Sequence, residues 1–386
     1  MSLTSMQGAL LGTRLTLWLG PVIAVPAPPT IVEALISVQV TLSDEGPDGF
    51  QLTFAVGRSG LFGLDYDLQM HPLLQPFRRV IVQVWNGVMP QVLIDGFITN
   101  RNLSVSNEPG QSTLTVTGED VRVIMDLREV SVPYPQSPVQ QRIQLILSKY
   151  LNYLSAPIVL PGLPPVAKPI TENVPLQSET DLEYINRMGE DYDYVFYVEP
   201  TPVPNINLAY WGPENRLSIP QSALSVNMGG DTNVESLNFT YDGLAPTTVL
   251  GAIQDKRIGA IFPIITLASL RPPLALMPAH LVQQPYVRSQ LARDMSALDL
   301  PEALSRAQAI TERSTSVVRA EGTLDMMRYG DILRPRRLVG VRGAGFTMDG
   351  FYYVKSVTHN IKHGEYTQDF TLEREGTGAI SPVVIP

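Results

Sequence analysis

Alternating apolar and polar residues indicate strands in the first third of the chain. At 15–19 leucine alternates with threonine and tryptophan, and at 38–42 valine and leucine alternate with polar residues. This period of two is typical of a strand with one buried face. The apolar run 80–85 leads into Asn86-Gly87, a pair that suits the positive φ angles of a type I′ hairpin turn. Strands linked by hairpins at this spacing predict a β-barrel or sandwich over residues 1–132.

Helical periodicity replaces this alternation in residues 133–222. Ser137-Pro138-Val139-Gln140 predicts a helix start, with serine as the N-cap and proline at the first helical position. The apolar residues that follow fall on one helical face; they are Val139, Ile143, Ile146, Leu147, Tyr150, Leu151 and Leu154. Thr180 and Glu183 have the spacing of a capping box, which predicts a second helix. With the apolar strand pattern at 194–198, the segment reads as a small α+β domain.

The last part of the chain, 223–386, returns to a strand pattern with one helix. Asp299-Leu300-Pro301-Glu302 predicts the start of that helix. A clear hairpin follows, with strands at 351–361 and 366–374 around a turn that contains Gly364. The chain is therefore predicted to be mainly β with an α+β insert, and its 386 residues suffice for two or three domains. We place their limits at 1–132, 133–222 and 223–386.

Composition and charge exclude several classes of function. The formal net charge of −9 argues against specific nucleic-acid binding, because proteins that neutralise phosphates concentrate lysine and arginine. With no cysteine in the chain, disulfides, thiolate zinc sites and cysteine nucleophiles are excluded. Apolar residues make up 44% and charged residues 17%, so the chain can fold throughout.

Two apolar stretches, 9–25 and 258–282, could be mistaken for membrane segments. Arg14, Gly20 and Pro21 interrupt the first, which is also short of the ~20 residues that a spanning helix needs. Four prolines and an arginine interrupt the second. We predict strands and loops in both stretches and no stable membrane insertion. Because a monomer would hide these residues poorly, we expect one or both at a contact with a partner.

The histidines do not indicate a metal site. His359 and His363 have a spacing of four, which on a helix would direct both rings at one ion. They instead fall on a strand and a turn, and Glu365 is the one acidic candidate for a third ligand. We expect no metal ligand, no catalytic residue and no cofactor-binding residue.

Other candidate chemistry is equally weak. The chain contains no G-x-S-x-G nucleophile motif. The densest acidic window, 179–193, lies on a predicted helix and its exit, so we interpret it as a solvated face. The glycines of 340–345 lie between strands and not before a helix, which is not the context of a phosphate loop.

A basic cluster surrounds Pro335 and consists of Arg334, Arg336, Arg337 and Arg342. We favour an exposed strand edge protected by charge. The alternative is that these arginines contact an acidic neighbour.

The C-terminal hairpin resembles a known family. The segments Gly350-Phe351-Tyr352-Tyr353-Val354-Lys355-Ser356-Val357-Thr358-His359 and Gly364-Glu365-Tyr366-Thr367-Gln368-Asp369-Phe370-Thr371-Leu372-Glu373-Arg374 are similar to the last hairpin of the late control protein D family. That family includes hub proteins of contractile-tailed phages and the hub portion of the VgrG spike of type VI secretion. Segments 177–185, 114–120 and 330–335 resemble further parts of the family in the same order.

The resemblance implies two tail-tube-like β-barrels flanking the α+β domain, and a trimer. Three subunits would offer six barrels and so adapt a hexameric tail tube to a three-fold spike. The chain ends soon after the hairpin without a repetitive β-prism, so we expect a separate spike protein. The other implied partners are the tube protein, further baseplate subunits and, as a candidate, the tape-measure protein.

The implied location is the baseplate of a virion tail or of an extracellular injection particle, assembled in the bacterial cytoplasm. A structural, non-enzymatic hub is therefore the leading hypothesis. Two alternatives remain open, a tail-associated cell-wall hydrolase and a generic β-rich binding module.

Overall fold

A computed structural model describes residues 13–58, 65–87, 89–108, 110–162, 174–254, 259–283, 286–293, 295 and 298–380 of the chain. Strands dominate it and helices are few, which confirms the prediction of a mainly β protein with a helical insert. Residues 9–12 of the first apolar stretch lie outside the described residues.

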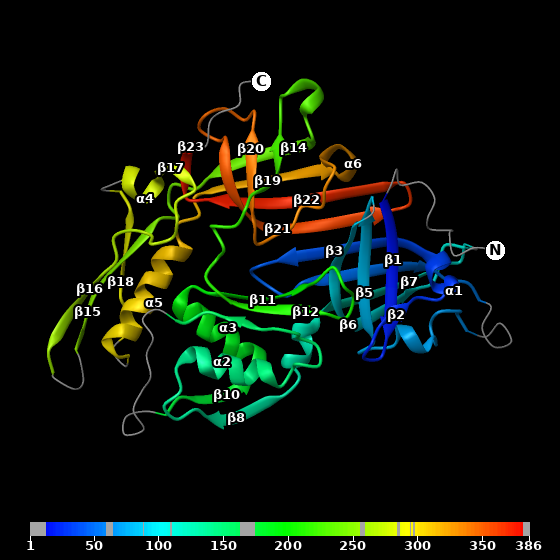
Figure 1. The fold of residues 1–386 in the computed structure, drawn as a ribbon, viewed down its shortest axis with the longest axis horizontal. Helices are drawn as coiled ribbons and strands as arrows, with labels where there is room; N and C mark the ends of the chain where they lie inside the picture. Colours follow the sequence, from blue (N-terminus) through cyan, green and yellow to red (C-terminus); the bar gives the residue numbers. More distant parts are fainter. Residues whose placement is uncertain are drawn as a thin grey trace.

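The N-terminal strands form a strongly curved sheet. In Figure 1, β1, β2 and β5 run across the direction of β3 and β7. The order of neighbours is β3-β4-β7-β6-β5-β1-β2. The strands are β1 (Thr13–Gly20), β2 (Val25–Pro26), β3 (Leu35–Ser43), β4 (Gly49–Ala55), β5 (Arg79–Asn86), β6 (Met89–Ser104) and β7 (Thr113–Asp120), with helix α1 (Pro29–Ala34) and the 3₁₀ turn η2 (Pro72–Leu74) between them.

The predicted alternation positions the core of this sheet. Leu52, Phe54 and Val82 are fully buried, because every second side chain of a strand faces the same side. The hairpin between β5 and β6 is confirmed, but its turn begins one residue later than the Asn86-Gly87 pair predicts. Asn86 is the last residue of β5 and pairs with Met89, and of the two residues only Gly87 has a positive φ, of 60°.

The C-terminal strands form the other half of the same sheet. Their order is β14-β19-β22-β21, with β20 and β13 extending beside β21. They are β13 (Gln221–Ser225), β14 (Val234–Tyr241), β19 (Val318–Asp325), β20 (Leu338–Arg342), β21 (Gly350–Lys362) and β22 (Glu365–Arg374), with η4 (Gly229–Asp231) and α6 (Met326–Tyr329). The predicted C-terminal hairpin is therefore confirmed as β21 and β22.

Strands β3 and β21 join the two halves. They pair antiparallel from Ser43 opposite Ser356 to Ser37 opposite Lys362, and the result is one 13-stranded sheet. Residues from both halves share its core, where Ile361 and Tyr366 pack with the N-terminal strands.

The middle segment packs helices on small sheets below this large sheet (Figure 1). Its core contains Ile143, Ile185 and Trp211. The elements are η3 (Val121–Met125), β8 (Glu129–Pro133) paired with β10 (Leu176–Thr180), α2 (Val139–Ser148), α3 (Asp181–Tyr192), and β11 (Val195–Pro200), β12 (Asn207–Gly212) and β9 (Ile158–Val159) in a three-stranded sheet.

The two predicted helix starts differ in accuracy. The capping box of α3 is confirmed, with the backbone N–H of Glu183 donating to the hydroxyl of Thr180 and the Glu183 carboxylate accepting from the backbone N–H of Thr180. Helix α2 begins one residue later than expected, so Pro138 is the N-cap. The Ser137 hydroxyl donates to the carbonyl of Pro135 instead.

A fourth group of elements, which we call the satellite layer, has its own small core. It consists of β15 (Thr247–Gln254), β16 (Ile261–Ile265), β18 (Arg288–Leu291) and helix α5 (Leu300–Arg313). Val249, Ile253 and Ile264 of its sheet pack with Ala303 and Ala307 of α5. Nearby lie β17 (Ala275–Pro278), which pairs with β23 (Gly376–Ala379), and α4 (Ala279–Val282).

The second apolar stretch, 258–282, thus contains strands, loops and one short helix over its described residues, 259–282. Within the described part of the chain no helix combines the length and apolarity needed to cross a bilayer. The division at 132 and 222 stays a prediction.

Candidate functional site

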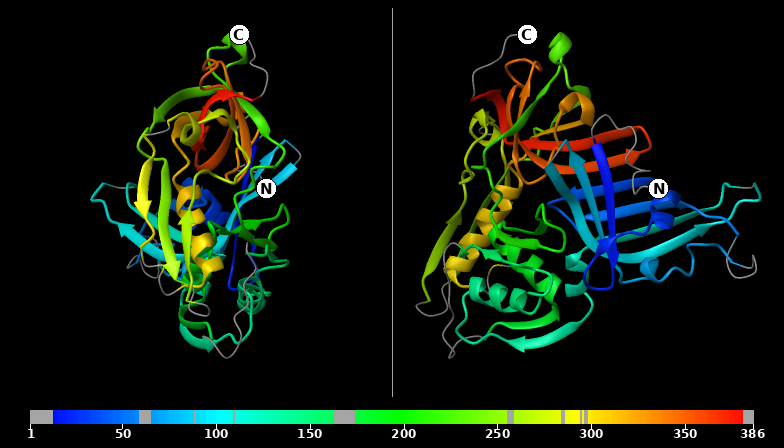
Figure 2. Two further views of the ribbon diagram at one scale, coloured as in Figure 1. Left: turned by 90° about the vertical axis from the view of Figure 1, so that its left-hand side faces the viewer. Right: turned by 45° about the vertical axis from the view of Figure 1, so that its right-hand side comes forward.

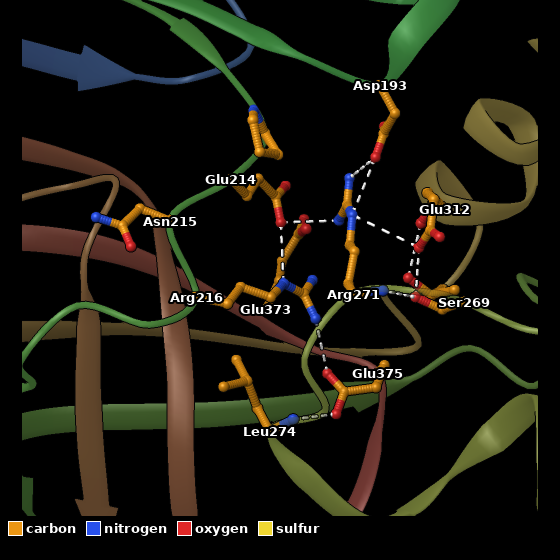
Figure 3. Close-up of polar contacts among 12 residues, drawn as sticks. Asp193, Glu214, Asn215, Arg216, Ser269, Arg271, Leu274, Glu312, Glu373 and Glu375 are labelled. Atoms are coloured by element: carbon orange, nitrogen blue, oxygen red, sulfur yellow. Dashed lines mark hydrogen bonds and ion pairs between the residues drawn. The ribbon is translucent and has the colours of Figure 1, made fainter. Parts of the chain in front are cut away.

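Buried charges gather where the middle segment, the satellite layer and the C-terminal strands meet. We call this set the central charge network; Figure 3 shows most of it. Its members are Asp44, Asp193, Glu214, Arg216, Arg271, Glu312, Lys355, Glu373 and Glu375.

Arg271 occupies the centre of the network. Its Nη1 donates to Oε2 of Glu214 at 2.7 Å, and its Nε donates to Oδ2 of Asp193 at 3.0 Å. A third carboxylate, that of Glu312, lies 3.8 Å away. Because an arginine guanidinium offers five donors in one plane, it can hold carboxylates from several elements at once.

Asp193 is positioned by the end of helix α3. It is the C-cap in the left-handed conformation, with φ of 57°, and this turns its side chain toward Arg271 (Figure 3). Burial raises the pKa of Asp193 to about 6, although Arg271 opposes the shift. Removing a carboxylate from water disfavours its charged form.

The pKa of Glu214 is shifted in the opposite direction to that of Asp193. Burial disfavours its charge, but Arg271, Arg216 and Lys355 outweigh burial and lower the pKa of Glu214 to about 2. Arg216 continues the network to Glu375 at 3.0 Å. The Glu375 carboxylate in turn accepts a hydrogen bond from the backbone N–H of Ala275 at 2.7 Å. The charges thereby connect β22 to the loop before β17.

Lys355 enters the network because β21 has a β-bulge. The register with β22 shifts between Val354 and Ser356, which leaves Lys355 as the extra residue. Its Nζ lies 3.3 Å from Asp44 and 3.6 Å from Glu214. A cavity of about 600 Å³ opens beside these groups and is lined by residues that include Asp44, Glu190, Asp193, Glu214, Arg271 and Lys355.

A second charged contact corrects our interpretation of the basic cluster. Arg336 is buried and donates to Oδ1 of Asp48 at 2.6 Å, and its guanidinium lies 4.4 Å from the ring centre of Tyr197. The favoured exposed edge is wrong for Arg336 because β3–β4 and β11 cover it. Arg334 is partly buried and donates to the carbonyl of Val92 at 3.0 Å.

The other two arginines of that cluster are less enclosed. Arg337 is paired with Glu199 at 2.8 Å with 47% of its side chain exposed, and Arg342 is exposed. The alternative interpretation, contact with an acidic neighbour, therefore holds inside the chain for Arg336 and Arg337.

A third buried pair connects the first strands to the middle segment. Nε and Nη2 of Arg79 each donate to an oxygen of Asp95 at 2.7 Å. Asn207 of β12 donates to the same carboxylate at 3.0 Å. A bidentate arginine–carboxylate pair of this kind fixes the relative orientation of the two side chains as well as their distance.

The two histidines of the C-terminal hairpin, His359 and His363, differ in burial. His359 is fully buried, its Nδ1 is hydrogen-bonded to the Tyr366 hydroxyl at 3.0 Å, and burial lowers its pKa to about 3. His363 is exposed in the hairpin turn. Among the described residues no cluster of three or more histidine, aspartate or glutamate side chains could hold a metal ion.

The acidic window 179–193 is only partly a solvated face. Asp181 is buried and accepts from Tyr150 at 2.8 Å and from Lys149 at 3.0 Å. Asp193 belongs to the central charge network. Glu183 and Glu190 are exposed, as predicted.

Sequence reasoning missed the partners that make these networks. From the sequence, Arg271 is predicted only to interrupt an apolar stretch, and no role is predicted for Asp95 or Glu214. A signal was present in Arg271 and Asp95, because a lone charge inside an apolar run requires a buried partner if the run is buried.

The solvent side of the large sheet is a polar surface that continues from one half to the other. Across β22, β21, β3, β4, β7 and β6, one row of paired positions contains only uncharged hydroxyl and amide side chains; they are Thr367, Asn360, Gln39, Gln51, Thr117 and Asn100. Gln39 donates to Asn360 at 2.9 Å across the β3–β21 pair. We call the solvent side of these strands, with β19 and β14, the polar face.

Comparison with known proteins identifies the fold. No protein-family model matches the chain, and no curated protein matches it. Among solved structures, a tail protein from Neisseria meningitidis MC58 is 11% identical, with 94% of this chain and 97% of that chain covered and a TM-score of 0.62. The 43 kDa tail protein of prophage MuSo2 from Shewanella oneidensis is 12% identical, with coverage of 94% and 98% and a TM-score of 0.63.

A chain of the Francisella PdpA–VgrG complex is 8% identical, with a TM-score of 0.56, and the match covers 99% of this chain and 56% of that one. Identities this low establish the fold alone. The chain therefore has the fold of phage tail proteins and of a chain of the PdpA–VgrG complex, in agreement with the resemblance of its C-terminal hairpin to tail hub proteins.

Proposed function

We propose that this chain is a structural baseplate hub of a contractile tail or injection particle. In this role it is a homotrimer that joins a hexameric tail tube to a separate trimeric spike. The polar face carries the proposal, because it extends without a break across both halves of the chain through the β3–β21 pair.

The composition of this face suits the wall of a water-filled channel. Its row of hydroxyl and amide side chains is polar and uncharged, so it can be hydrated and presents no apolar surface. Toward the rims it carries more acidic than basic residues, namely Glu119, Glu321, Glu365 and Asp369 against Arg319 and Lys362. An acidic balance repels a polyanion, so nucleic acid or an acidic cargo would pass without binding.

The buried charge networks suit a part that transmits force. Arg271 and Arg336 each connect elements far apart in the chain, and Asp95, which Arg79 holds, accepts a hydrogen bond from Asn207 of the distant strand β12; the geometry of these bonds is directional. Breaking a buried pair is costly, so the layers are held in one relative orientation. A rigid joint is what an adaptor between tube and spike requires.

Two strand-rich halves in each chain provide the symmetry match. Three copies would present six such halves to a tube with six-fold symmetry, while the trimer itself meets a three-fold spike. Other baseplate subunits and the tape-measure protein are further partners in this proposal. The particle assembles in the bacterial cytoplasm and functions at the virion tail or outside the cell.

The ion pairs and hydrogen bonds of the buried carboxylates support a non-enzymatic role. Glu214 and Glu375, whose side chains are 5% and 4% exposed, are each occupied by arginine or backbone donors. A wall hydrolase would instead keep two carboxyl groups open to a sugar chain. Incubating the purified protein with cell-wall material in a zymogram tests this alternative, and we expect no clearing.

Assembly with the tube and spike proteins of the same gene cluster tests the hub role. The tagged chain is co-expressed with each protein separately and with both, and the masses of the purified complexes are measured. We expect one complex with three copies of this chain that contains both partners. A chain that retains neither partner contradicts the proposal.

A further inference from the structure

The sheet of the satellite layer is covered on one side only. Helix α5 packs against Val249, Ile253 and Ile264. Figures 1 and 2 show β15 and β16 on the side of α5 that is remote from the large sheet. The opposite face of the three strands is bare in the described structure.

That bare face is apolar. Alternate positions of its strands place Leu250, Ile261, Ile265 and Leu291 on it, and these are 38%, 72%, 55% and 65% exposed. The following loop adds Leu267, which is 67% exposed. Single exposed leucines are ordinary, but a contiguous apolar sheet face indicates a surface that is buried by a partner.

The charge of this region differs from that of the rest of the chain. Residues 246–293 contain one acidic residue, Asp255, and five basic residues, whereas the whole chain has 37 acidic and 28 basic residues. Of these basic residues, Arg271 is largely enclosed in the central charge network, and Arg288 alternates to the side of the sheet opposite Leu291. Arg293, two residues past the end of β18, is exposed. The surface therefore combines apolar side chains with positive charge on an otherwise acidic molecule.

We propose that the bare face of the satellite sheet binds a second copy of this chain, at an acidic surface elsewhere on that copy. Contact of the face with itself would bring the Arg293 residues of the two copies together, which like charges oppose. Contact with the acidic remainder of another copy is favoured by charge as well as by apolar burial. Such a contact joins two different surfaces, and contacts of this type close into a ring when the rotation between copies closes, as it does in a trimer. The inference rests on the proposed trimeric hub and assigns its subunit contact.

The molecular mass in solution tests the inference. The variant Ile261→Ser/Ile265→Ser/Leu291→Ser changes side chains that are exposed in the single chain, so its circular dichroism and unfolding midpoint should match the wild type. The control Leu217→Ser/Ile219→Ser/Leu244→Ser changes side chains that are 82%, 90% and 73% exposed outside the satellite layer. Sedimentation equilibrium should show oligomers for the wild type and the control, and a monomer for the face variant.

A charge-reversal variant adds an electrostatic readout. Arg293→Glu should raise the dissociation constant several-fold, and added salt should weaken association of the wild type. A face variant that keeps the wild-type mass, a control that dissociates equally, or a wild type that is monomeric at every concentration overturns the inference.

The two proposals can fail separately. A chain that is monomeric in solution and yet binds the tube and spike proteins retains the hub role but not this contact. A chain whose oligomer depends on the face and that binds neither partner retains this contact but not the hub role.

Discussion

The guanidinium of Arg271 donates to the carboxylate of Asp193, with Nε 3.0 Å from Oδ2, although 78 residues separate the two in the chain. The side chains of both are nearly enclosed, at 12% and 9% exposure. This contact ties the satellite layer to the end of helix α3. It shows that the layers are joined by charges that neither layer could bury alone.

Arg271→Met should be strongly destabilising. The substitution leaves Asp193 and Glu214 without their shared cation in a buried site, and such losses cost roughly 3–5 kcal/mol. Chemical denaturation measures the change in the free energy of unfolding. The matched control is Arg319→Met, which removes an ion pair with Glu321 whose side chains are 54% and 59% exposed. The control should change stability by less than about 1 kcal/mol; equal effects of the two variants would contradict the role assigned to burial.

Asp193→Asn should alter how stability depends on pH. The pKa of Asp193 is raised to about 6 in the folded chain from 3.8, so its stabilising contribution is present below pH 3.8 and is lost as the pH rises through 6. Between pH 4 and 7 the wild type should lose about 3 kcal/mol relative to the asparagine variant. Unfolding of both proteins is measured in parallel at several pH values. A difference in unfolding free energy that does not change with pH would contradict the raised pKa of the buried Asp193 carboxyl group.

His359→Gln should have the opposite pH signature. The pKa of His359 is lowered to about 3 in the folded chain from 6.5, so its contribution is present above pH 6.5 and is lost as the pH falls toward 3. The wild type should lose roughly 3 kcal/mol relative to the variant between pH 7 and 4. The exposed His363→Gln is the control and should leave the profile unchanged. A parallel profile for both variants would argue against burial of His359.

Arg336→Gln should destabilise the chain far more than Arg337→Gln. Arg336 bridges Asp48 and the ring of Tyr197 with 5% of its side chain exposed, whereas the Arg337 side chain is 47% exposed. We expect a loss of several kcal/mol for Arg336 and less than about 1 kcal/mol for Arg337. Comparable small losses would restore the interpretation of the cluster as an exposed edge.

Local signals in the sequence predicted the elements well. The alternation at 15–19, the hairpin that follows the apolar run 80–85 and the capping box of Thr180 each depend on residues close in the chain. Helix α2 was misplaced by one residue because both Ser137 and Pro138 can precede a helix, and local propensity does not decide between them.

Long-range contacts could not be predicted in the same way. The bulge that turns Lys355 toward Asp44 has no local sequence mark. The separation of α5, β15, β16 and β18 into their own layer depends on which apolar faces meet, and several arrangements satisfy the same pattern. The pairing of β3 with β21 joins residues about 320 apart, such as Gln39 and Asn360.

A cryo-electron microscopy reconstruction of the assembled tail tip tests the hub account most directly. The account predicts three copies of the chain around the axis, with Gln39, Gln51 and Asn360 of the polar face lining the channel between tube and spike. A reconstruction in which this face points to the outside, or in which the chain lies away from the axis, would contradict it.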